Sequence, residues 1–207
     1  MILDVRGNGG GLIWAGERLL QLFTTNQIEP TRAQFAVTPL TVALSQQAAF
    51  APWKSSLERA VETGASFSAA FPITPSARCN DIGRRYPGPV ALITDARCYS
   101  TTDMFAAGFQ DHGIGKILGV DDNTGAGGAN VWTIDVLRHF TGANGPVHAL
   151  PRGGDMRVAI RRMLRVGPQA GTEIEDLGVE PDQTHQTTRR DLLQNDGDLL
   201  EAAVRLL

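Results

Sequence analysis

Two short segments of the chain share one pattern, an apolar run that enters a sharp turn of small or polar residues and then gives way to helical spacing. They are residues 1–11, MILDVRGNGGG, and residues 90–103, VALITDARCYSTTD. The run at 90–94 is apolar almost throughout, which is typical of a strand buried on both faces of a parallel sheet. Such strands require helices on both sides, so this pattern restricts the chain to an α/β architecture.

The two turns carry complementary chemical groups. Gly9–Gly11 leave backbone N–H groups uncovered at the start of one helix, and Ser100 places a hydroxyl at the start of the other. Open α/β folds bind ligands at the carboxyl ends of their strands, where Ser100 is expected. A hydroxyl beside oriented N–H donors is the minimum equipment for acyl transfer, a nucleophile and a place for a developing oxyanion.

The rest of the chain continues the alternation of strands and helices. Residues 101–112 predict a helix and 116–120 a strand, which makes a parallel crossover with the strand at 90–95. Residues 131–137 and 156–166 also predict strands, and 196–207 predict a terminal helix capped by Asp196. Residues 64–89, rich in Ser, Pro and Gly, predict an irregular excursion from the core.

Composition excludes several classes of protein. The chain has 207 residues and a net charge of -3, which argues against binding nucleic acid through phosphate neutralisation. No apolar run approaches the roughly 18 residues that a membrane span needs. Two cysteines make no disulfide framework, and they are compatible with a cytoplasmic or a periplasmic location.

Each turn also has a purely structural explanation. The stretch from Ser100 to Asp103 fits a capping box, in which both side chains satisfy backbone donors of the helix. Three glycines can serve only a tight connection between strand and helix. A phosphate-binding loop is disfavoured, because Gly9–Gly11 are not followed by the Lys-Ser/Thr ending of that motif.

Taken together, the segments resemble the family of C-terminal-processing (tail-specific) serine peptidases and the tricorn core protease. Residues 2–12 resemble its strand with an Asp-Leu-Arg-x-Asn-x-Gly-Gly turn, and 89–119 its nucleophile strand, helix and next strand. Residues 175–182, EDLGVEPD, resemble its closing Gly-Val-x-Pro-Asp element. Three motifs in the right order span nearly the whole chain, and they imply a ClpP/crotonase-like spiral core of parallel strands and helices.

The resemblance assigns roles to particular residues. It implies that Ser100 is the nucleophile and that the N–H groups of Thr101 and Gly10 form the oxyanion hole. The tail-specific branch uses a lysine base, but Ala126 stands at that place, so the chain is closer to the tricorn-like branch. That branch uses a glutamate just before the closing element, where Glu175 stands; its alternative is a surface acid in an acidic loop.

No internal histidine is a convincing general base. His112 lies about 12 residues beyond Ser100 on one predicted helix, about 18 Å away. The remaining histidines lie in loops or a polar tail: His139, His148 and His185. In the tricorn branch the histidine precedes the glycine turn, so we expect that residues 1–207 are a serine peptidase catalytic core that lacks an N-terminal cap and other upstream segments.

The predicted function is therefore a serine endopeptidase that acts on proteins or peptides through an acyl-enzyme at Ser100, with its histidine supplied from upstream. The resemblance implies no metal or organic cofactor. The net charge argues against a nucleic-acid partner, the apolar runs are too short for a membrane span, and a homo-oligomer stays open. Two alternatives remain: an inactive peptide-binding or scaffolding module of the same fold, and a crotonase-like acyl-CoA enzyme, whose paired N–H groups would not need a hydroxyl at Ser100.

Overall fold

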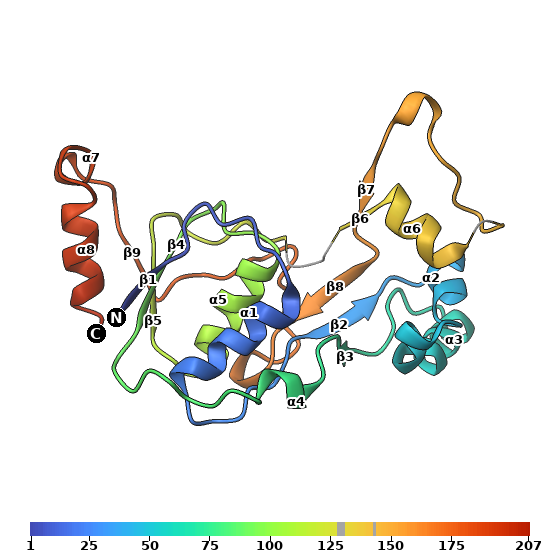
Figure 1. Ribbon diagram of the computed structural model, residues 1–207, viewed down its shortest axis with the longest axis horizontal. Coiled ribbons are helices and arrows are strands. Elements are labelled where there is room, and N and C mark those ends of the chain that lie inside the picture. The colour runs from blue at the N-terminus through green and yellow to red at the C-terminus, as the bar shows by residue number, and fades with distance from the viewer. Residues whose placement is uncertain (128–130, 143) are drawn as a thin grey trace. The chain divides into compact units, whose positions relative to one another are not determined.

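The computed structural model describes residues 1–127, 131–142 and 144–207, which fall into two compact units (Figure 1). The first unit comprises Met1–Thr31, Pro72–Gly128 and Met163–Leu207, and the second comprises Arg32–Phe71 and Ala129–Arg162. The predicted site residues Gly10, Ser100, Thr101 and Glu175 all belong to the first unit. That these units together make one catalytic core stays a prediction.

A parallel sheet is the centre of the first unit. Its strands are β1 (Ile2–Asp4), β4 (Ala91–Thr94), β5 (Lys116–Gly119) and β9 (Gln183–Thr184), in the order β1-β4-β5-β9. Each neighbouring pair is parallel. All four residues of β4 are buried, as its apolar sequence predicts. The α/β class is thereby confirmed.

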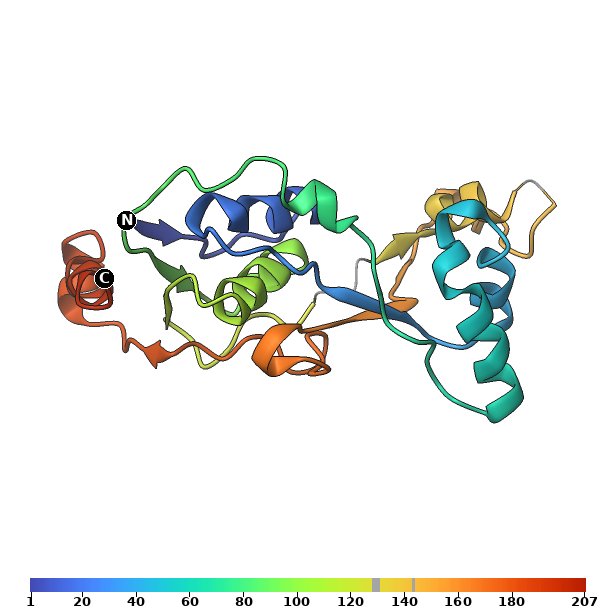
Figure 2. The same ribbon diagram turned by 90° about the horizontal axis from the view of Figure 1, so that it is seen from below.

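Helices cover both faces of this sheet. Ile93 and Leu118 pack against Leu199 of α8 (Gly197–Val204), and Ile2 joins the same cluster. Side chains alternate along a strand, so the next residue of β1, Leu3, faces the other way and lines a hollow with residues of two further helices. These are α1 (Ile13–Leu20) and α5 (Thr101–Asp111), which lie side by side in both views (Figures 1 and 2).

The remaining elements of the first unit are short. They are a 3-10 helix at Gln21–Phe23, α4 (Ser76–Cys79), a 3-10 helix at Gly167–Gln169 and α7 (Arg189–Leu193). The expected excursion at residues 64–89 contains only α4, the two-residue strand β3 (Phe71–Pro72) and a bridge from Phe67 to Ala36. It therefore has little regular structure, as its composition predicts.

The second unit has an aromatic core. Its elements are β2 (Arg32–Phe35), α2 (Pro39–Leu44), a 3-10 helix at Ala48–Trp53, α3 (Lys54–Thr63), β6 (Trp132–Thr133), α6 (Ile134–Thr141), a 3-10 helix at Pro151–Gly153 and β7 (Arg157–Val158). The strands β3, β2 and β8 (Arg161–Leu164) form a sheet of order β3-β2-β8. Phe50 makes ring contacts with Phe35, Trp132 and Phe140, which holds the unit together.

Two expectations about secondary structure are wrong in part. Residues 131–137 are a strand only at Trp132–Thr133, because the Thr133 hydroxyl then accepts the N–H of Val136 and starts α6. The β-branched residues there favoured a strand, but Ile134 and Leu137 are buried at helical spacing. The strand expected at 156–166 is interrupted between β7 and β8.

Asp196 precedes α8 but does not cap it through its side chain. It has a positive φ of 61°, and its carboxylate binds the guanidinium of Arg6 at 2.6 Å instead. The ion pair ties the terminal helix to the segment that follows β1.

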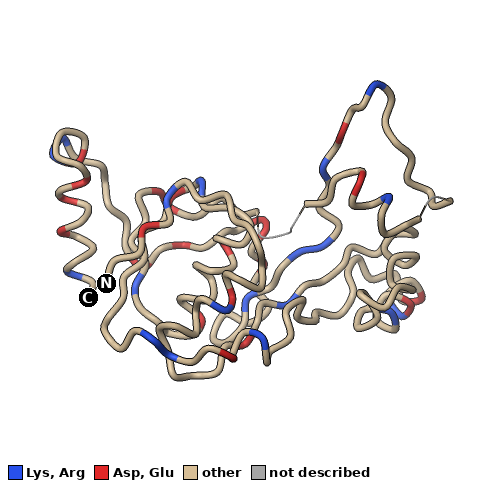
Figure 3. Tube along the Cα trace, viewed as in Figure 1, with Lys and Arg blue, Asp and Glu red and all other residues tan. Residues whose placement is uncertain are grey.

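Acidic and basic residues are interspersed along the trace of the first unit (Figure 3). Of the helices in the described ranges, none has the length and apolar character needed to cross a membrane. Likewise, the described residues contain no group of three or more His, Cys, Asp or Glu side chains arranged to hold a metal ion.

Candidate active site

Ser100 occupies a strained turn between β4 and α5. Its φ is 57° and its ψ is -121°, a region that non-glycine residues rarely adopt. Such backbone strain costs about 1–3 kcal/mol and persists only where the surrounding structure imposes it. The same combination of strand, sharp turn and helix exposes the nucleophilic serine in α/β-hydrolases.

The hydroxyl of Ser100 does not cap the helix. Within the described residues it makes no hydrogen bond to the first turn of α5, so the capping-box alternative fails for this side chain. The carboxylate of Asp103 accepts the N–H of Gly127 at 3.2 Å, while its Oδ1 has no hydrogen-bond partner among the described residues. The Ser100 hydroxyl is left available for other chemistry.

Gly10 lies directly against the turn formed by residues 99–101, here called the serine turn. A Cβ added to Gly10 would lie 2.6 Å from the carbonyl oxygen of Tyr99 and 2.7 Å from both Ser100 Cβ and Thr101 N. Gly10 also has a φ of 92°, so both its space and its backbone conformation require glycine. Two turns about ninety residues apart in sequence therefore meet at the carboxyl ends of β1 and β4.

Three hydrogen bonds join the glycine turn to the start of α5. The N–H of Tyr99 donates to the backbone oxygen of Asn8 at 3.0 Å. The hydroxyl of Thr102 donates to the Asn8 side-chain oxygen Oδ1 at 3.0 Å, and the hydroxyl of Thr101 donates to the carbonyl oxygen of Gly11 at 2.8 Å. These bonds fix the relative positions of the two turns.

Asp95 and Cys98 make a second connection between the segment after β4 and the segment after β1. The N–H of Gly7 donates to the carboxylate of Asp95 at 2.9 Å, and the thiol of Cys98 donates to the carbonyl oxygen of Val5 at 3.2 Å. Burial raises the pKa of Asp95, but hydrogen bonds from Gly7, Cys98 and Arg97 outweigh it and lower the pKa overall. Burial raises the pKa of the Cys98 thiol to about 12, so this cysteine is a structural donor.

The backbone donors near Ser100 are not equivalent. The N–H of Gly10 is already used, because it donates to Asn8 Oδ1 at 2.9 Å. The N–H groups of Thr101 and Gly11 have no hydrogen-bond acceptor among the residues that the structure describes. The predicted pair, Gly10 and Thr101, is thus brought together, but only the Thr101 donor is unoccupied in this arrangement.

A family model for Peptidase family S41 matches residues 1–185. The chain belongs to this family. No curated protein sequence matches it.

Solved structures of similar fold include one described as a peptidase and one named as a processing protease. Mature CPAF is 17% identical with a TM-score of 0.67, and the match covers 100% of this chain and 42% of that one. A protein from Parabacteroides merdae, described as a peptidase, is 22% identical with a TM-score of 0.62, covering 99% and 50%. The photosystem II D1 C-terminal processing protease is 18% identical with a TM-score of 0.51, covering 100% and 40%. The chain thus spans half or less of the length of these structures.

The carboxylate of Glu175, the predicted relay acid of this S41 chain, is held by the backbone of β8. Its Oε2 accepts the N–H of Met163 at 2.6 Å, and its Oε1 is buried without a hydrogen-bond partner among the described residues. Burial raises the pKa of Glu175 to about 7, and the charge of Asp103 adds to the rise. Asp103 is itself fully buried, and its pKa is raised mainly by that burial. The role of Glu175 stays a prediction.

The histidines of the first unit are engaged away from Ser100. The Nε2 of His112 accepts the N–H of Glu29 at 2.9 Å, while its Nδ1 lies 2.8 Å from the oxygen of Gly108. His185 pairs with Asp191 at 2.7 Å. The other two histidines, His139 and His148, belong to the second unit.

Ala126, where the resemblance predicts the lysine of the tail-specific branch, lies in a loop that wraps Tyr99. A Cβ added to Gly125 or Gly127 would lie 2.0–2.1 Å from the Tyr99 ring, so the loop can pass the ring only as glycine at both positions. The N–H of Gly127 donates to Asp103 at 3.2 Å. The residue before Ser100 thereby positions the loop, a role that the sequence alone did not reveal.

An apolar hollow of about 340 Å³ borders both turns. Gly10, Gly11, Thr101 and Thr102 form its edge. The rest of its lining is predominantly apolar and comes from β1, α1 and α5, including Leu3, Val5, Leu12, Ala15, Leu19 and Phe105. Ser100 itself is not part of the lining, but its neighbour in the chain, Thr101, is.

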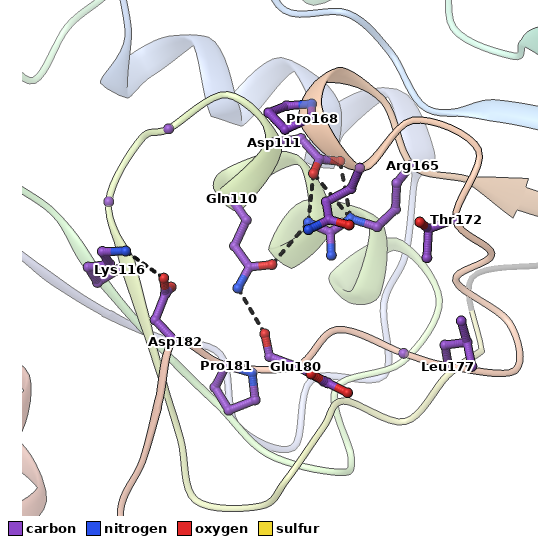
Figure 4. A pocket seen from close by; sticks show the side chains of 14 residues that line it. Gln110, Asp111, Lys116, Arg165, Pro168, Thr172, Leu177, Glu180, Pro181 and Asp182 are labelled. Carbon is purple, nitrogen blue, oxygen red and sulfur yellow. Dashed lines mark hydrogen bonds and ion pairs between the residues drawn. The ribbon is translucent and has the colours of Figure 1, made fainter.

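A larger hollow of about 710 Å³ lies at the other end of α5 (Figure 4). Four of its charged residues form two pairs: Arg165 with Asp111 at 2.6 Å, and Lys116 with Asp182 at 2.7 Å. Lys116 begins β5, whereas Ser100 follows the carboxyl end of β4, so this hollow lies at the opposite edge of the sheet from the serine turn. Its paired charges stabilise the packing of α5.

Proposed function

We propose that this chain carries the nucleophile and the oxyanion donors of a serine endopeptidase that acts through an acyl-enzyme at Ser100. The observation that carries the proposal is the contact of Gly10 with Ser100 and Thr101. At this contact the glycine turn meets the Ser100 hydroxyl, which does not cap the helix. It also meets the Thr101 N–H, which has no acceptor among the described residues. Membership of Peptidase family S41 supports peptide-bond hydrolysis as the reaction.

The proposed reaction follows from these groups. Ser100 Oγ attacks the scissile carbonyl carbon while its proton passes to a general base. The N–H of Thr101 and an N–H of the glycine turn stabilise the negative oxygen of the tetrahedral intermediate. The carbon–nitrogen bond then breaks, the amine leaves with the proton from the base, and water hydrolyses the ester to regenerate Ser100.

The general base in this proposal is a histidine from a segment outside these 207 residues. This is supported by the engagement of His112 and His185 in hydrogen bonds elsewhere. Glu175 would orient that histidine, since its buried Oε1 has no hydrogen-bond partner in the described part of the chain. The raised pKa of Glu175 would fall when a cationic imidazolium forms beside it.

The proposed substrates are proteins or peptides with an apolar side chain next to the scissile bond. The hollow of about 340 Å³ beside Gly10 and Thr101 supports this preference, because its lining is predominantly apolar. Burying such a side chain favours binding by about 25 cal/mol per Å² of apolar surface.

A peptide-binding module without catalysis is the second candidate. It is favoured by Ala126 at the lysine place and by the engaged histidines. A crotonase-like acyl-CoA enzyme is a third, and it would use the N–H groups without needing the Ser100 hydroxyl.

A serine-directed fluorophosphonate separates these candidates. The protein is expressed as the 207-residue chain and joined to any segment encoded directly upstream. The proposed function expects covalent labelling and peptide hydrolysis in the longer form, both lost in Ser100→Ala. Peptide binding without labelling would favour the module, and acyl-CoA binding that survives Ser100→Ala would favour the crotonase-like alternative.

A further inference from the structure

We propose that Asn8 is a positioning residue that holds the glycine turn in register with Ser100. The inference rests on the proposed function, in which that turn supplies an oxyanion donor. It assigns a purpose to a side chain that contacts neither the hydroxyl of Ser100 nor a predicted histidine.

The side-chain oxygen of Asn8 joins two segments through one atom. Asn8 Oδ1 accepts the N–H of Gly10 at 2.9 Å and the hydroxyl of Thr102 at 3.0 Å. Thr102 is buried in the first turn of α5, two residues after Ser100. The position of Gly10 is therefore tied to the helix that carries the nucleophile.

The turn needs such a restraint because its own residues supply little. Gly9 and Gly11 have no atom within 4 Å of the place where a Cβ would be, so no side-chain packing limits them. Glycine populates both signs of φ readily, and a run of three has many accessible peptide orientations. An oxyanion hole works only if its donors are already oriented when charge develops.

The same contact decides which donors are free. Because Asn8 Oδ1 occupies the N–H of Gly10, the N–H groups of Gly11 and Thr101 are among the donors at the junction that have no acceptor in the described part of the chain. In the proposal Asn8 holds the Gly10 peptide away from the oxyanion position and thereby presents the next N–H, that of Gly11. Thr101 reinforces this orientation by donating its hydroxyl to the Gly11 oxygen.

The kinetic test compares Asn8→Ala, Thr102→Val and Thr102→Ser in the form of the protein that shows Ser100-dependent peptide hydrolysis. Loss of one oriented donor costs about 10²–10³-fold in kcat, and loss of its support is expected to cost about 10-fold or more. Asn8→Ala and Thr102→Val should lower kcat with KM nearly unchanged, whereas Thr102→Ser keeps the hydroxyl and the rate. The double variant should be no slower than Asn8→Ala, because both changes remove one interaction.

A matched control removes another buried hydroxyl of the same unit. Thr24 accepts the N–H of Asn26 at the end of the first helical segment, away from both turns. Thr24→Val should leave kcat unchanged. A higher kcat in Asn8→Ala would overturn the proposal, since the bond would then close the site, and additive effects of the two changes would overturn it as well.

A measurement without catalysis separates this proposal from the proposed function. Amide hydrogen exchange of Gly10, followed by NMR in the 207-residue chain, should accelerate at least 10-fold in Asn8→Ala and stay slow in Thr24→Val. If the unaltered protein never shows Ser100-dependent hydrolysis, the proposed function fails, and this exchange rate alone decides the role of Asn8. Unchanged protection of Gly10 in Asn8→Ala would overturn the positioning role.

Discussion

The carboxylate of Asp95 accepts the backbone N–H of Gly7, which lies 88 residues earlier in the chain, at 2.9 Å. Asp95 follows β4 and Gly7 follows β1, so the bond joins the ends of two neighbouring strands just before the glycine turn and the serine turn. It is the first of a series of contacts that continues through Asn8 to Thr102.

Replacing Asp95 by Asn should loosen this junction and change its dependence on pH. The pKa of Asp95 is lowered in the folded state, so its stabilising effect is present above the unfolded pKa of about 3.9 and is lost as pH falls through the folded value. Asp95→Asn should cost about 1–3 kcal/mol at pH 7 and much less at pH 2. Urea unfolding at both values measures this, with the exposed Asp122→Asn as control. An equal cost at both pH values would contradict the assignment.

Ser100→Gly should be more stable than Ser100→Ala. Glycine relieves a φ of 57°, a strain of about 1–3 kcal/mol, and this exceeds its entropic cost of about 0.5–1 kcal/mol. Ser100→Ala itself should be close to the unaltered protein, because no capping bond is lost. Thermal unfolding of the three proteins gives the order, and a less stable glycine variant would mean that Ser100 is not strained.

Gly10→Ala should disrupt the site, whereas Gly9→Ala should not. The added methyl at Gly10 would meet three atoms of the serine turn at 2.6–2.7 Å, while that at Gly9 meets nothing within 4 Å. We expect Gly10→Ala to cost about 2–4 kcal/mol, as overpacking at a positive φ does. Denaturant unfolding and fluorophosphonate labelling would reveal the difference. Equal stability and equal labelling of the two variants would contradict the close contact between Gly10 and Ser100.

Glu175→Gln should gain stability at alkaline pH relative to the unaltered protein. The folded pKa of about 7 lies above the ordinary value of 4.5, so the folded state disfavours the ionised form. Stability of the unaltered protein therefore falls as pH rises from about 4.5 to 7, and glutamine removes that slope. Unfolding measured at pH 4 and pH 8 tests this. A variant with the same slope as the unaltered protein would assign the slope to another group.

Turnover of an active, longer form provides the functional counterpart. Glu175→Gln should reduce hydrolysis much more than Glu173→Gln, because Glu175 is the one of the two whose Oε1 is buried without a hydrogen-bond partner among the described residues. Equal rates in the two variants would leave Glu175 without a catalytic role.

The 207-residue chain alone should hydrolyse peptides very slowly. A serine hydroxyl without a base is a weak nucleophile at neutral pH, and His112 and His185 are engaged elsewhere. Peptide hydrolysis by the purified chain, compared with Ser100→Ala, measures this. Efficient hydrolysis that depends on Ser100 would direct attention to His139 and His148.

The sequence predicts those parts of the molecule that depend on local pattern. The buried strand β4, the helix after Ser100 and the parallel crossover to β5 all follow from apolar runs and their spacing. The helix α6 was missed because its β-branched residues favour a strand locally, while burial of Ile134 and Leu137 on one helical face decides otherwise.

The connections inside the candidate site could not be predicted in the same way. Asn8 is a polar residue in a turn, and no neighbouring residue indicates that its side-chain oxygen contacts Thr102, 94 residues away. Asp196 similarly looks like a helix cap, but Arg6, in the segment that follows β1, gives its carboxylate another partner. Such choices depend on which segments the fold brings together.

The alignment of β1 with β4 has a consequence for how the site can vary. Leu3 lies opposite Leu92 and Asp4 opposite Ile93, so the two strands end, and their turns begin, at the same level of the sheet. A slip by one residue would displace Gly10 by about 3.3 Å along the sheet and turn Leu3 to the opposite face. Substitutions deep in the sheet can therefore alter chemistry at Ser100 without touching it, and the glycine turn tolerates insertions or deletions less than its open surroundings suggest.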